Sequence, residues 1–194
     1  MIYQIPSYSG RKSVMITGKH LWQFQFAKTN DLVIESIVEI ILWCIIHKRG
    51  GVMVSSHDVA AYILKTLGSM TAMKLQKLVY YCQAWSLVWD EKPLFPEKIE
   101  AWSNGPVVRE LYDRHRGKFI VDSWRGNSGV LTSKQKQTIN AVLHFYGKKT
   151  SQWLSDLTHQ ERPWVEARKG LPPEARGSAE ITLAAMAEYY GSLQ

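Results

Sequence analysis

The clearest hydrophobic pattern in the chain lies between residues 71 and 89. Apolar side chains recur there three, four and seven residues apart, at Leu75, Leu78, Val79, Cys82, Trp85 and Trp89. This spacing is typical of an amphipathic helix with one wide buried face. Thr71 is placed to cap the helix, because its hydroxyl can accept a hydrogen bond from a free backbone N–H of the first turn. We therefore predict a central helix over Thr71–Trp89 whose exposed side carries Lys74, Lys77 and Tyr81.

Shorter patterns on both sides of this segment predict further helices. Ser55 and Asp58 have the spacing of a capping box, and Gly68 is placed to end the helix that follows them. Asn-Gly-Pro at 104–106 predicts a turn that leads into a helix over Pro106–Arg116, with proline in its first turn. Later apolar stripes and breaks predict helical segments over residues 131–147, 151–160, 164–169 and 178–190.

Two short segments have the character of strands instead. Lys98–Trp102 alternates in polarity and is too short for a stable helix, and Phe119–Val121 lies in an irregular, glycine-containing stretch. The fold class that we predict is mainly α, a single compact domain of about six helices with a minor short β element.

The first 52 residues do not share this order. Their one long apolar run, Leu32–Ile46, has only about 15 residues and contains Glu35 and Glu39, whereas a membrane-spanning helix needs about 20 apolar residues. Regular patterning begins at Met53, directly after the pair Gly50-Gly51. We divide the chain into an N-terminal extension at 1–52 and a domain at 53–194. Our hypothesis is that the extension is a translated upstream leader, and an idiosyncratic extension is the alternative.

Composition narrows the function classes only slightly. Hydrophobic residues make up 45% of the chain and charged residues 21%, which is typical of a globular protein. The net charge of +7 makes an acidic partner plausible but says nothing about the fold. The two cysteines, Cys44 and Cys82, form neither a disulfide framework nor a zinc site, and the absence of a clear export signal favours a cytoplasmic location.

Candidate catalytic chemistry is sparse. His159 and Glu161 are the best pair, but residues two apart on a helix point in different directions, so a structural role is the main interpretation and a hydrolase the alternative. Cys82 lies on the predicted buried face, where a thiol is inert. No metal motif occurs, and we predict no enzyme activity, no metal and no cofactor.

The best candidate for binding a polyanion or a protein partner is the basic stretch between residues 109 and 125. It contains Arg109, Arg114, Arg116, Lys118 and Arg125, with Tyr112, Phe119 and Trp124 between them. Acidic residues are interleaved as well, as on an ordinary solvated face. A protein-binding face and weak nucleic-acid contact, including a DNA-binding regulator, both remain alternatives at this stage.

Several segments, in this order, resemble one known family. They are Asp58-Val59-Ala60 with Tyr62-Ile63-Leu64, Met73–Trp85, Lys92-Pro93-Leu94-Phe95, Ile99–Trp102, Asn104–Val108 with Leu111-Tyr112, and Leu154–Glu161 with Pro163-Trp164. Together they are similar to the Panacea domain of the SocA-like antitoxins, which are also described as phage-associated GepA-like proteins. The resemblance covers residues 54–190 and leaves the N-terminal extension out.

This resemblance implies a small, mostly helical cytoplasmic protein, often encoded in prophages. It implies the antitoxin of a type II toxin–antitoxin system, which neutralises a cognate toxin protein by direct binding without a cofactor or a membrane. It also implies that Gly105-Pro106 is a helix entry and that Thr158, His159 and Trp164 form a packed corner. Candidate structural residues are Trp85, Trp102, Gly105, Pro106, Thr158, His159 and Trp164. Candidate partner-binding residues are Lys74, Lys77, Tyr81, Arg109, Arg114 and Arg116.

Overall fold

The computed structural model describes residues 53–172 and 174–193, which belong to one compact unit. The predicted N-terminal extension at 1–52, including the apolar run Leu32–Ile46, lies outside the described residues. In the described part of the chain there are seven α-helices, one short 3-10 helix and two small antiparallel strand pairs. The predicted fold class, mainly α with a minor β element, is therefore confirmed.

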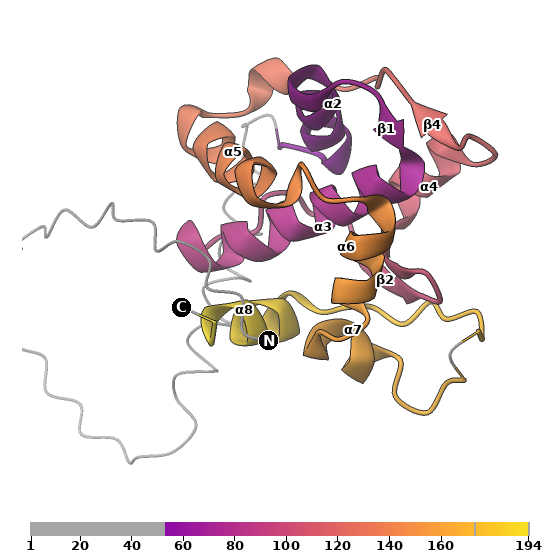
Figure 1. Cartoon of the computed structure of the whole chain (residues 1–194). Helices are drawn as coiled ribbons and strands as arrows, with labels where there is room; N and C mark the ends of the chain where they lie inside the picture. The colour runs from indigo at the N-terminus through magenta and orange to yellow at the C-terminus, as the bar shows by residue number, and fades with distance from the viewer. Residues whose placement is uncertain (1–52, 173, 194) are drawn as a thin grey trace, which may run out of the picture. The chain divides into compact units, whose positions relative to one another are not determined.

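Helix α3 (Ala72–Trp89) is the central element, as predicted. It packs against α2 (Ser56–Leu67), α5 (Ser133–Tyr146), α6 (Ser151–Thr158) and α8 (Leu183–Gly191). Figure 1 shows α3 passing between α2 and α5 on one side and α8 on the other. Because neighbours cover it on several sides, α3 has no polar face of the usual kind.

Side-chain caps fix where the helices begin. The hydroxyl of Thr71 accepts a hydrogen bond from the backbone N–H of Lys74 at 3.1 Å, so the predicted cap of α3 is confirmed. The predicted capping box of Ser55 and Asp58 is also present at the start of α2. Thr132, Thr150 and Thr182 cap α5, α6 and α8 in the same way. These caps satisfy N–H groups that have no partner within their own helix.

The two strand pairs lie at the periphery of the helices. Strand β1 (Met70–Thr71) pairs with β4 (Ile120–Val121), and β2 (Ile99–Trp102) pairs with β3 (Gly105–Val108). The short strands predicted at 98–102 and 119–121 are thus confirmed within about one residue. A 3-10 helix at Ser128–Val130 follows β4 and precedes α5.

The predicted helix over Pro106–Arg116 is wrong in its first third. Residues Gly105–Val108 form β3, and helix α4 begins only at Arg109 and ends at His115. Asn104 and Gly105 therefore belong to a hairpin, and Gly105-Pro106 is not a helix entry. The physical reason is tertiary: β3 is buried and pairs with β2 along its whole length, which outweighs the local preference of proline for a first helical turn.

The last helix also begins later than predicted. Helix α8 starts at Leu183 instead of residue 178, because the residues before it extend along β2. The N–H of Ala101 donates to Ala179 O at 2.8 Å, and the N–H of Ile181 donates to Ile99 O at 2.8 Å. This stretch covers the outer edge of the β2–β3 hairpin before the chain turns into α8. Helix α7 (Arg162–Ala167) completes the fold beside α8.

Candidate functional site

Two of the three partner-binding candidates on α3 lie inside the protein. Lys77 is 1% exposed, Tyr81 is fully buried, and the whole run from Leu75 to Leu87 is buried. The prediction that Lys77 and Tyr81 lie on an exposed side of α3 is therefore wrong. Lys74 is half-buried, and its ammonium group donates to Gly147 O at 2.7 Å, at the C-terminal end of α5. That end carries partial negative charge, which an ammonium group stabilises.

Lys77 is enclosed by the hairpin and by α6. Its ammonium group donates to Pro106 O at 3.1 Å. A Cβ atom placed on Gly105 would lie 2.7 Å from Lys77 Nζ and 2.9 Å from Thr158 Oγ1, so only glycine leaves room for the lysine. Burial lowers the pKa of Lys77 to about 7, because the charged form loses its hydration. Burial thus shifts Lys77 toward its neutral form.

A second buried group, Glu161, lies between three helices. Its Oε2 accepts hydrogen bonds from the Tyr190 hydroxyl at 2.7 Å and the Tyr81 hydroxyl at 3.2 Å. Tyr190 comes from α8 and Tyr81 from α3, while Glu161 is the N-cap of α7. Burial raises the pKa of Glu161 to about 8, and the two tyrosine hydroxyls partly oppose that rise. This network joins α3, α7 and α8 through a carboxyl group that is mostly protonated at neutral pH.

The corner formed by His159 and Trp164 is a stacked pair. The two rings lie 4.2 Å apart between centroids and are tilted by 25°. The indole N–H of Trp164 donates to Trp102 O at 2.9 Å, which ties α7 to strand β2. Thr158 is fully buried beside them, and its hydroxyl donates to Ser155 O at 2.8 Å. The corner therefore joins the α6–α7 link to the β2–β3 hairpin.

His159 and Glu161, the pair behind the hydrolase alternative, have separate surroundings. Glu161 faces tyrosine hydroxyls, whereas His159 stacks on Trp164 and has its Nε2 buried without a hydrogen-bond partner among the described residues. Burial lowers the pKa of His159, and the nearby charge of Lys77 lowers it further. The two side chains thus belong to different contacts within the α6–α7 link.

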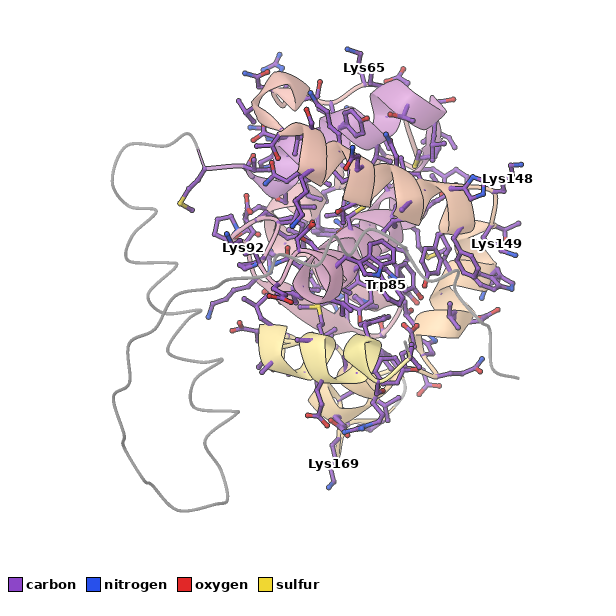
Figure 2. The ribbon with its side chains drawn as sticks, turned by 90° about the vertical axis from the view of Figure 1, so that its left-hand side faces the viewer. Lys65, Trp85, Lys92, Lys148, Lys149 and Lys169 are labelled. Carbon is purple, nitrogen blue, oxygen red and sulfur yellow. The ribbon has the colours of Figure 1, made fainter. Side chains whose placement is uncertain are left out.

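Trp85 and Cys82 belong to the core. The indole N–H of Trp85 donates to the Tyr146 hydroxyl at 3.3 Å, and its ring packs edge to face on Tyr190. Figure 2 shows Trp85 inside the molecule, whereas Lys65, Lys148 and Lys169 point outward at its rim. Burial strongly raises the pKa of the Cys82 thiol, which keeps it protonated and unreactive.

The three arginine candidates, in contrast, are all exposed. Arg109 forms an ion pair with Asp113 at 3.1 Å, one helical turn further along α4. Arg114 donates to Arg125 O at 3.2 Å, and neither Arg114 nor Arg116 forms an ion pair with a described residue. A row of contacting rings runs beside these cations, formed by Trp102, Tyr112, His115, Trp124 and His57.

Some residues that organise the molecule were not singled out from the sequence. Gln83 accepts hydrogen bonds from the N–H groups of Leu94 and Phe95 and donates to Phe95 O. Gln76 bonds both backbone polar groups of Val108. One feature of the sequence pointed to these roles. Gln76, Lys77 and Gln83 lie among apolar residues on α3, and buried polar side chains of this kind need hydrogen-bond partners from other parts of the chain.

Among the described residues, no three His, Cys, Asp or Glu side chains gather as a metal-binding group. None of the helices in the described part of the chain combines the length and the hydropathy that a membrane span requires.

The comparisons with known proteins point to one family. A family model described as Antitoxin SocA-like, Panacea domain, matches residues 75–165, from the first turn of α3 into α7. No curated protein and no solved structure matches the chain. The matched range contains most of α3, the β2–β3 hairpin, α4 and the His159–Trp164 corner. Residues 75–165 of the chain are therefore similar to the Panacea domain of the SocA-like antitoxins.

Proposed function

We propose that this chain is the antitoxin of a type II toxin–antitoxin pair and neutralises a cognate protein toxin by direct binding in the cytoplasm. The observation that carries the proposal is the match of residues 75–165 to the SocA-like Panacea family model. The proposed mechanism needs no cofactor and no chemical step. The antitoxin occupies the surface through which the toxin acts.

The distribution of polar groups supports a binding function over a catalytic one. Lys77 and Glu161, whose pKa values are shifted toward neutrality, are both almost fully buried and bonded to groups of their own chain. A catalytic acid or base has to reach its substrate. Arg114 and Arg116, which form no ion pair with a described residue, lie in contrast on the surface around the end of α4, where a protein partner can contact them.

The test begins with the product of the neighbouring gene. We expect that product to arrest growth when expressed alone, and this chain to restore growth and to co-purify with it when both are expressed. The intact mass of the toxin recovered from the complex should be unchanged, because binding alters no covalent bond. Absence of both rescue and co-purification would count decisively against the proposal.

A single variant separates binding from hydrolysis. His159→Ala removes the imidazole of the catalytic alternative but not the surface cations. We expect this variant to rescue growth whenever it folds and binds the toxin as the wild type does. A variant that folds and binds normally but no longer rescues would favour the hydrolase.

A further inference from the structure

The loop that joins α4 to β4 has an unusual surface. We call residues 114–120, Arg-His-Arg-Gly-Lys-Phe-Ile, the basic loop; they run from the end of α4 to the first residue of β4. It contains three cations and no carboxylate, and Arg114, Arg116 and Lys118 are all exposed. Directly after them, Phe119 is 79% exposed and Ile120 is 51% exposed, the two highest values among the large apolar side chains described. Adjacent exposed apolar residues with a charged rim are typical of an interaction site.

The backbone of the basic loop is fixed although its side chains are exposed. His115 is buried and its Nε2 lies 2.9 Å from Gln76 Nε2, which holds the end of α4 against α3. Gly117 makes the turn at a φ of +80°, and the N–H of Lys118 donates to His115 O at 2.8 Å. Beyond it, Phe119 O accepts from the N–H of Ala72 at 2.9 Å. Because these contacts already fix the backbone around Phe119, little conformational entropy is lost when a partner binds there.

The rest of the chain leaves this surface uncovered in the part that the structure describes. In the β2–β3 hairpin, residues 179–181 cover β2, and the amide of Gln76 bonds both backbone polar groups of Val108 at the end of β3. No described strand pairs with the outer edge of β4, and the register of β4 with β1 directs the N–H and C=O of Ile120 away from β1. The fold thus protects one sheet edge and exposes the other beside an apolar pair.

We propose that the basic loop is the main toxin contact, with Phe119 inserted into an apolar pocket that carboxylates surround on the toxin. The charge of the loop selects this partner chemistry. None of its three cations forms an ion pair with a described residue, so they need acidic groups opposite them, and the two apolar side chains need a dry pocket between those groups. A central aromatic residue with a charged rim is the usual composition of a binding hot spot. This inference rests on the proposed antitoxin function and identifies the surface of this chain that binds the toxin.

The experiment measures the dissociation constant of the full chain with its toxin. The loop variants are Phe119→Ser, Arg116→Glu and Lys118→Glu, each made singly. The matched controls are Val165→Ser, at a side chain that is 45% exposed on α7, and Lys169→Glu, at an exposed lysine on the opposite side of the molecule from Lys65 in Figure 2. Circular dichroism and thermal unfolding check that each variant is folded, since exposed substitutions seldom change stability by more than ~0.5 kcal/mol.

We expect each loop variant to weaken toxin binding at least tenfold and each control to change it less than twofold. For Arg116→Glu and Lys118→Glu, the loss should shrink as salt is raised, because salt screens the contacts that they remove. Loop variants that fold and bind as tightly as the wild type would overturn the inference while leaving the antitoxin function standing. Failure of the wild type to bind any toxin would instead refute the proposed function.

Two other occupants are distinguished by further measurements on the same variants. A gel shift with duplex DNA that Arg116→Glu abolishes, with toxin binding unchanged, would assign the basic loop to nucleic acid and overturn the inference. A concentration-dependent dimer that Phe119→Ser dissociates, again with toxin binding unchanged, would assign it to a second copy of the chain and overturn it equally.

Discussion

Lys77 and Glu161 are two ionisable side chains that the fold holds mostly in their neutral forms. Lys77 is 1% exposed and Glu161 is 4% exposed, and neither forms an ion pair with a described residue. Burial therefore shifts their pKa values toward each other, to about 7 for the lysine and about 8 for the glutamate. Because the shifts have opposite signs, they make opposite contributions to the pH dependence of stability.

Glu161→Gln should remove the fall in stability that the wild type shows as pH rises above about 4.5. Between its usual pKa of 4.5 and about 8, the folded wild type binds more protons at this site than the unfolded chain, so stability falls as pH rises. Glutamine keeps an acceptor for Tyr81 and Tyr190 but does not titrate. We expect the free energy of unfolding of the variant, relative to wild type, to increase by up to ~1.4 kcal/mol per pH unit in this window. Urea denaturation at pH 5, 6 and 7 measures it. A constant difference would contradict the assignment.

Lys77→Met should have the opposite effect on the alkaline side. Between about 7 and 10.5 the unfolded chain binds more protons at this lysine than the folded chain, so wild-type stability rises with pH. Methionine keeps the length of the side chain and cannot titrate. We expect the stability of the variant relative to wild type to be highest at pH 7 and to decline toward pH 9.5. Denaturation midpoints across this range measure it, and parallel curves for the two proteins would rule it out.

Gly105 should tolerate alanine much less well than Gly117 does. Both have positive φ, +99° and +80°, so alanine is strained at each. Only at Gly105 would the new methyl group also meet Lys77 and Thr158, whereas nothing lies within 4 Å at Gly117. We expect a loss of about 1 kcal/mol for Gly117→Ala and at least about 2 kcal/mol for Gly105→Ala. Equal losses, measured by chemical denaturation, would show that Lys77 moves aside easily.

At the scale of the element, α3 is stabilised by polar side chains as well as by its apolar ones. Gln76, Lys77, Gln83 and Ser86 are buried, and each bonds the backbone of a segment that packs on the helix. These side-chain bonds satisfy backbone N–H and C=O groups that the segments do not pair themselves and that would otherwise bond water. The helix therefore sets the position of the following turn, the hairpin and the start of α4.

Gln83→Leu should destabilise the protein strongly although leucine is a good helix former. The change leaves the N–H groups of Leu94 and Phe95 and the carbonyl of Phe95 without their side-chain partner in a buried place. We expect a loss of at least about 3 kcal/mol, because three buried groups lose their partner and each unsatisfied group costs about 1–3 kcal/mol. The matched control, Gln152→Leu, removes an exposed bond to Asp156 and should cost less than about 0.5 kcal/mol. Similar losses for both variants would show that water replaces the amide at Leu94.

At the scale of the whole molecule, the fold extends beyond the range that matches the family model. Helix α8 lies C-terminal to residues 75–165, yet Tyr190 on α8 bonds Glu161 and packs its ring on Trp85. Residues 179–181 also pair with β2. The matched segment is therefore only part of the cooperative unit, because its core is completed by the chain that follows it.

Truncation after Gly177 should accordingly abolish cooperative unfolding. The shortened chain would expose the surface of Tyr80, Tyr81 and Trp85 that α8 covers and would leave the outer edge of β2 open. The control ends after Gly191, the last residue of α8, and should retain the near-ultraviolet circular dichroism of the full chain. A chain ending at Gly177 that still unfolds in a single sharp thermal transition would contradict this view of α8.

The hydrophobic pattern of the sequence was sufficient for the elements whose signals are local. The span of α3, its Thr71 cap, the Ser55–Asp58 capping box and the strand at 99–102 all depend on spacing and on residues within a turn of each other. Burial of Cys82 followed from the same spacing. The similarity of residues 75–165 to the SocA-like family could likewise be recognised from the sequence, because the order of its motifs along the chain does not depend on the tertiary structure.

Contacts between distant segments decided the rest. Lys77 and Tyr81 fall on the polar side of a helical wheel, yet Pro106 and Glu161, 29 and 80 residues further along, provide their partners inside the protein. The same kind of pairing made residues 105–108 a strand and left Phe119 exposed beside three cations. The sequence alone determined the central helix, its caps and the resemblance of residues 75–165 to the SocA-like family. Only the tertiary structure decided which polar residues face water, because a side chain can leave water only when another part of the chain supplies its hydrogen bonds.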